Sequence, residues 1–169
     1  MSVELNHTIV LAADKEVTAE HLTSLLGLPD HTTFGPFAVV TLANGVSLDI
    51  DDDHGRPHPQ HYAFLVTEEE FDAIHARIVA NGLTYWADPS HREEGAVNHG
   101  DGGRGLYWLD PNGHNLEILT VPYGGWPGCD HRSMRSVPAA HHATQWQVGR
   151  ARMRPVNRPI DTCFTRSGH

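Results

Sequence analysis

The sequence predicts an α+β fold built from two copies of one module, in which a strand and a helix are followed by further strands. Three observations predict it. An apolar segment with a histidine near its start occurs twice, at residues 5–11 and 60–66. Each is followed by a helical apolar pattern that ends at a glycine, Gly27 or Gly82. Strand-like segments then complete each copy, and two such modules pack as an α+β domain.

The first copy covers about residues 4–53. Its expected elements are strands over 5–11, 37–42 and 46–50 and a helix whose apolar stripe is Leu22, Leu25 and Leu26. Asn44-Gly45 separates the last two strands and is a strong signal for a hairpin. The polar stretch 51–59, with its aspartates and prolines, indicates a linker to the second copy.

The second copy covers about residues 60–121. Its expected elements are strands over 60–66, 83–86, 106–109 and 115–119 and a helix whose buried face is Phe71, Ile74 and Ile78. Thr67 and Glu70 form a capping-box pattern that predicts the start of this helix. The final strands of the two copies correspond, so that Glu117 is the repeat equivalent of Asp49. In each module we expect the helix to cover the outer face of a cupped sheet, whose other face lines a cavity.

Composition and charge limit the classes of function. The chain has 169 residues, 39% of them hydrophobic, which suits one ordinary globular domain. The net charge of −9 argues against binding of nucleic acid. No apolar run is long enough to predict a membrane span, and residues 1–7 show no signal peptide, so we expect a cytoplasmic protein.

The last part of the chain differs from the rest. Residues 1–123 carry five Lys and Arg against 19 Asp and Glu, whereas residues 124–169 carry seven Arg against two Asp. We therefore expect a domain over 1–123 and an extension over 124–169, rich in Arg, His and Pro, that is peripheral or mobile.

Three metal-capable side chains fall on the predicted cavity face. Side chains alternate along a strand, and the bulky side chains Tyr62, Phe64 and Val66 suit packing under the helix. His61 then points to the opposite face, toward the cavity. By the same alternation, we expect Glu117 and His7 on the cavity face of their strands. Each residue taken singly is more often an ordinary hydrogen-bonded strand residue. Together they form the two-histidine, one-carboxylate set that binds a divalent metal on one side and leaves positions open for substrate and water or O₂. Asp49 is a secondary candidate.

The segment 105–117, GLYWLDPNGHNLE, together with 5–10 and 61–66, resembles the vicinal oxygen chelate superfamily. That superfamily includes glyoxalase I, extradiol dioxygenases, fosfomycin-resistance transferases and bleomycin-resistance proteins. The resemblance implies paired βαβββ modules and the metal ligands His7, His61 and Glu117. Homodimers are common in this architecture, so His7 belongs either to the site of its own chain or to that of the partner.

Segments 85–89, 98–105 and 122–124 are most similar to a dioxygenase-like subgroup that includes an oxygenase of chartreusin biosynthesis. This implies an Fe(II)-dependent oxygenase acting on a catechol-like or polyphenolic small molecule, with Mn, Zn or Ni as alternative metals. The first alternative function is a non-redox lyase, isomerase or thiol transferase. Against a fosfomycin transferase, residues 102–105 lack the serine and lysine expected there, and no arginine follows Glu117 where one is expected. The second alternative, a drug-sequestering binding protein, generally lacks the three ligands.

The long connection 88–104 predicts a binding loop. We expect Tyr107 to stack on substrate or donate a hydrogen bond and His99 to act as a general base. The candidate substrate-binding residues are Trp86, Asn98, Arg104 and Tyr107. The alternative for Arg104 is an ion pair at the surface of a solvated loop.

Overall fold

The structure, a computed structural model, describes residues 3–53, 55 and 57–125. The predicted C-terminal extension lies outside the described residues from 126 onward. In chain order the elements are β1 (His7–Ala12), α1 (Lys15–Leu26), β2 (Thr32–Phe34), β3 (Phe37–Thr41), β4 (Ser47–Asp52), β5 (His61–Leu65), α2 (Glu68–Ala80), β6 (Tyr85–Trp86), the 3₁₀ turn η1 (Gly100–Gly102), β7 (Gly105–Leu109) and β8 (Asn115–Leu119). This succession confirms the two βαβββ modules.

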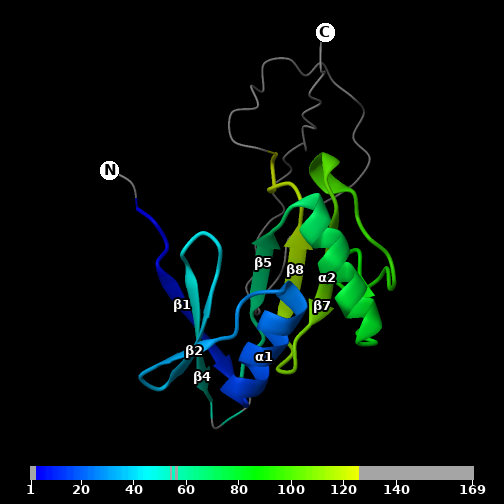
Figure 1. The fold of residues 1–169 in the computed structure, drawn as a ribbon. Coiled ribbons are helices and arrows are strands. Elements are labelled where there is room, and N and C mark those ends of the chain that lie inside the picture. The colour runs from blue at the N-terminus through cyan, green and yellow to red at the C-terminus, as the bar shows by residue number, and fades with distance from the viewer. Residues whose placement is uncertain (1–2, 54, 56, 126–169) are drawn as a thin grey trace, which may run out of the picture.

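Each module forms its own four-stranded mixed sheet (Figure 1). The strand orders are β1-β4-β3-β2 and β5-β8-β7-β6, so the outer strands β1 and β5 hold equivalent places. The registers also agree, because Ile9 lies opposite Asp49 in the first sheet and Ala63 lies opposite Glu117 in the second. The sequence repeat is therefore a structural repeat, residue for residue.

The helix boundaries follow from their capping residues. Asp14 accepts hydrogen bonds from the first-turn amides of α1, and Gly27 ends that helix at a φ of 71°. Thr67 and Glu70 complete the predicted capping box of α2. Within the described residues no helix is both long and apolar enough to cross a membrane.

The helices and one face of each sheet enclose a shared hydrophobic core. Its largest fully buried side chains include Trp108 and Phe71. The modules also exchange hydrogen bonds, for example from Asn112 Nδ2 to Thr18 Oγ1 at 2.8 Å. The opposite face of the sheets remains uncovered at several apolar positions, since Ile9 is 52% and Leu65 49% exposed.

Three details differ from the sequence prediction. The short strand β2, paired antiparallel with β3, was not expected. The strand β4 runs two residues into the predicted linker, because its parallel pairing with β1 continues as far as Ala12 and Asp52. The two sheets also stay separate and do not close into a single cup within one chain (Figure 1).

Candidate metal centre

His61 and Glu117 lie side by side on the face of the second sheet that points away from α2. They come from the neighbouring parallel strands β5 and β8, and His61 Nε2 is 3.2 Å from Glu117 Oε2. His61 Nδ1 lies 2.9 Å from the carbonyl oxygen of Asn115, so this nitrogen donates and Nε2 is the atom directed at the carboxylate. The hydrogen bond to Glu117 raises the pKa of His61. Burial of the ring lowers this pKa, and the hydrogen bond to the Asn115 carbonyl raises it.

The Glu117 side chain is only 1% exposed, and a buried carboxylate needs polar partners. Tyr123 supplies one, because its hydroxyl lies 2.7 Å from Oε1 and 2.8 Å from Oε2. The hydroxyl of Tyr107 lies 2.7 Å from that of Tyr123. The ring of Tyr107 stacks on the His61 ring, with centroids 6.2 Å apart. Burial raises the pKa of both phenols, so both remain hydroxyl groups at neutral pH.

A second layer of side chains adjoins the pair. Trp86 lies opposite Tyr107 in the β6–β7 pairing and stacks on His91 with ring centroids 4.1 Å apart. His91 Nε2 in turn lies 3.1 Å from Asn115 Oδ1. The predicted substrate residues Trp86 and Tyr107 are thus brought next to the His61–Glu117 pair.

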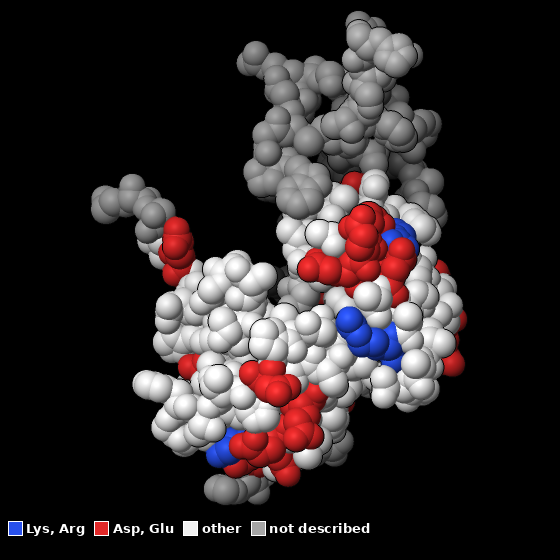
Figure 2. All heavy atoms as spheres, in the orientation of Figure 1, with Lys and Arg blue, Asp and Glu red and all other residues white. Residues whose placement is uncertain are grey.

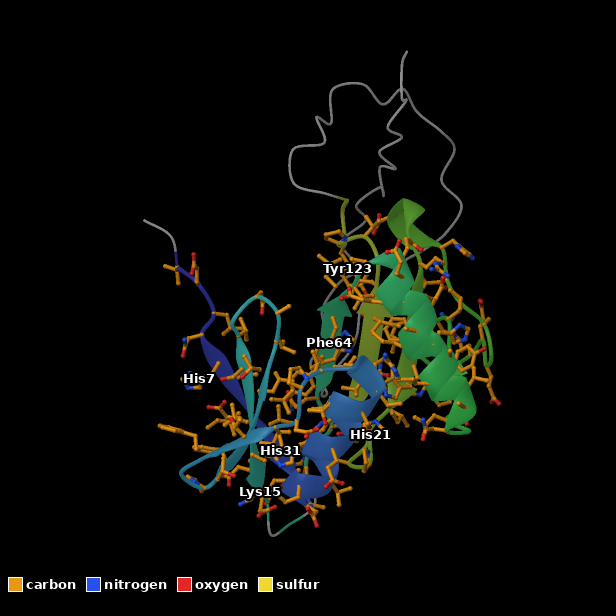
Figure 3. The ribbon with its side chains drawn as sticks, viewed as in Figure 1. His7, Lys15, His21, His31, Phe64 and Tyr123 are labelled. Carbon is orange, nitrogen blue, oxygen red and sulfur yellow. The ribbon has the colours of Figure 1, made fainter. Side chains whose placement is uncertain are left out.

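His7, the third predicted ligand, is not brought to the pair. It lies on β1 of the other sheet, well apart from Tyr123 (Figure 3), and its Nδ1 contacts Asn6 Oδ1 at 2.8 Å. Asp49 lies on that first sheet as well and accepts a 2.7 Å hydrogen bond from Ser47. Across the described ranges 3–53, 55 and 57–125, no three His, Cys, Asp or Glu side chains converge as a metal site within one chain.

Three further predicted site residues have other surroundings. Arg104 lies against α2, with ion pairs to Glu68 and Asp72 at 2.6 and 2.7 Å, which matches the surface alternative. The Asn98 side chain donates to the carbonyl of Ala87 at 2.8 Å and accepts from the backbone N–H of Gly100. This side chain therefore fixes the loop. His99 is exposed and immediately precedes η1.

Tyr123 contacts the pair and is the residue of the candidate site that sequence reasoning missed. It follows β8 and sits outside any strand, so alternation along a strand gives no information about its direction. The turn Pro122–Gly125 folds it back over Glu117, with Gly124 at a φ of 79° and Gly125 at 82°. The available signal was the Tyr-Gly-Gly sequence at 123–125, which begins four residues after the end of the strand that carries the predicted carboxylate.

Comparison with known proteins identifies relatives of two kinds. Two solved structures named oxidase ChaP-H1 and oxidase ChaP-H2 are 57% and 60% identical to the chain, both with a TM-score of 0.72. They match 73% and 74% of this chain and 100% and 98% of their own. A glutathione transferase FosA from Serratia marcescens is 32% identical over 124 residues, which cover 70% of this chain and 81% of the relative. No protein-family model matches the chain.

Proposed function

Since the chain belongs to the vicinal oxygen chelate superfamily, we propose that it is a cytoplasmic, homodimeric Fe(II)-dependent dioxygenase-type oxidoreductase that acts on an aromatic small molecule. The observation that carries the proposal is the His61–Glu117 pair, with Nε2 and Oε2 3.2 Å apart on the sheet face that points away from α2. Identity of 57–60% to proteins named as oxidases supports an oxidative reaction for that site.

The residues of the pair fit a divalent metal. A histidine whose Nδ1 donates to a backbone carbonyl presents Nε2 as a ligand in a fixed orientation, as His61 does through Asn115. Glu117 adds a buried carboxylate whose negative charge a cation would balance. When bound, Fe(II) would supply the redox chemistry and the open positions that oxygenation of an aromatic diol requires. Trp86 and Tyr107 would hold the ring of the substrate beside it.

We propose that the third ligand is the partner subunit's His7. In its own chain His7 is exposed on β1, at the edge of the first sheet, while His61 is on β5, at the edge of the second. Both sheets expose apolar side chains on the same face, among them Ile9 and Leu65. A two-fold dimer that places the first sheet of one chain against the second sheet of its partner would cover these faces and complete two identical sites.

The second candidate function is a thiol transferase, which the similarity to the glutathione transferase favours. The surroundings of the basic side chains count against a fosfomycin transferase in particular, because the described residues offer no Lys or Arg side chain at the pair to bind a phosphonate substrate. Each described Lys or Arg is engaged away from the pair: Lys15 with Asp52, Arg77 with the carbonyl of Leu25, Arg92 with Asp88, and Arg104 with α2. Among the charged side chains on the face shown in Figure 2, acidic ones cover more of the surface than basic ones.

The proposal is tested by anaerobic loading with Fe²⁺, followed by measurement of O₂ uptake with a panel of catechols and quinols. We expect uptake by the wild-type protein with at least one of them, and its loss in Glu117→Gln, which keeps the size of the side chain and removes its charge. The thiol transferase is favoured instead if Mn²⁺-loaded protein consumes glutathione or bacillithiol anaerobically and the Fe²⁺-loaded protein takes up no O₂. Unchanged aromatic ligand binding by Glu117→Gln in metal-free protein would favour a binding protein.

A further inference from the structure

The Tyr123 hydroxyl is directed into the protein although the residue as a whole is 67% exposed. Its ring lies at the surface while its oxygen contacts both oxygens of the nearly inaccessible Glu117 carboxylate. Figure 3 shows it beyond the end of the second sheet, where the chain leaves β8. The turn at 122–125 and a contact from the Gly124 amide to Asp101 Oδ2 at 3.3 Å set this position.

The direction of the hydrogen bonds can be assigned. A phenol carries one hydrogen, and a carboxylate can only accept, so Tyr123 donates to Glu117. Its oxygen can then only accept from Tyr107, whose hydroxyl is 2.7 Å away. Tyr107, Tyr123 and Glu117 thus form a directional chain that ends at the carboxylate.

The two carboxylate oxygens differ in their surroundings. Oε1 has the shorter contact to Tyr123, at 2.7 Å, whereas Oε2 is shared between Tyr123 at 2.8 Å and His61 Nε2 at 3.2 Å. A hydrogen bond retained by Oε1 leaves Oε2 directed toward the imidazole. A cation held by His61 Nε2 would meet Oε2, the oxygen that lies 3.2 Å from that nitrogen.

We propose that Tyr123 is a positioning residue for the metal: it holds Oε1 of Glu117 so that Oε2 faces His61 Nε2 as a single-oxygen ligand. This inference rests on the proposed function, since it assumes that the pair binds a metal. Tyr107 supports this arrangement by donating to the Tyr123 hydroxyl, and its own hydroxyl also interacts with Glu117. Tyr123 lies outside the apolar core that packs the second sheet against α2.

The test is an anaerobic titration with Co²⁺ alone, followed by its visible absorption, on Tyr123→Phe and on the control Tyr85→Phe. Tyr85 lies on β6 of the second sheet, where its ring meets His75 edge-on and outside the site. We expect Tyr123→Phe to bind Co²⁺ roughly 10- to 100-fold more weakly with an altered spectrum, the usual effect of losing a partner of a metal ligand. Tyr85→Phe should match the wild-type protein in affinity and spectrum.

A double-mutant cycle separates positioning from a general structural effect. If Tyr107 acts through Tyr123, Tyr107→Phe weakens Co²⁺ binding in the wild-type background and has no further effect in Tyr123→Phe. Wild-type Co²⁺ affinity and spectrum in Tyr123→Phe would overturn the inference while leaving the proposed function intact. If the wild-type protein itself binds no Co²⁺, the proposed function fails first and the inference fails with it.

Discussion

The proposed dimer can be tested by complementation between two damaged chains. His7→Ala and His61→Ala each remove one imidazole from every site of a homodimer. If each site combines His7 of one chain with His61 and Glu117 of the other, a heterodimer of the two variants has one site with both imidazoles and one with neither. A two-fold dimer contains two equivalent sites, so the heterodimer should recover about half of the wild-type metal stoichiometry. The Ile9 and Leu65 faces supply the surface for such pairing.

The assay is co-expression of the two variants with different affinity tags, purification through both tags, and anaerobic measurement of bound Co²⁺ per dimer. Each homodimeric variant serves as a control and should bind Co²⁺ much more weakly than the wild-type protein. Should the heterodimer bind no more Co²⁺ than the controls, with wild-type homodimers binding fully, the metal site would be contained in one chain. Full binding by His7→Ala homodimers would exclude His7 as a ligand.

Three further predictions concern residues away from the pair. Trp108→Ala should lower the free energy of unfolding by roughly 3–5 kcal/mol in urea, because the indole is fully buried; a loss below about 1 kcal/mol would contradict its place in the core. Arg104→Gln should cost only about 1 kcal/mol, since Glu68 and Asp72 are mostly exposed, and reduced Co²⁺ affinity in this variant would contradict its placement against α2. Burial lowers the pKa of His21 in the folded protein, although the charge of Asp110 opposes this shift. The unfolded chain therefore binds a proton at His21 more readily than the folded protein does. The free energy of unfolding should fall as the pH drops below about 6.5, the ordinary pKa of histidine in an unfolded chain. His21→Gln should flatten this dependence, and an unchanged pH profile would refute it.

The features that sequence reasoning captured are those set by local chemistry. Alternation along β5 and β8 correctly placed His61 and Glu117 on one face, because the parallel pairing of these strands keeps Ala63 opposite Glu117. The capping box at Thr67 likewise gave the start of α2. Such features depend on residues near one another in sequence or on regular strand geometry.

The features that the sequence leaves open or misses depend on contacts between elements. A surface ion pair of Arg104 is an alternative that the sequence offers, but nothing local to the residue indicates that its partners lie on α2. The direction of Tyr123 is missed, because it comes from the turn after β8. The sequence leaves open which chain's site His7 belongs to, because the repeat alone does not determine how the two modules pack.

Metal analysis of anaerobically purified protein shows whether His61 and Glu117 hold a divalent metal. We expect about one equivalent of iron per chain in the wild-type protein and its loss in both His61→Ala and Glu117→Gln. Thr67→Ala, which removes only the α2 cap, should retain the metal and serves as a control for general destabilisation. Equal metal content in the wild-type protein and the Glu117→Gln variant would contradict the account.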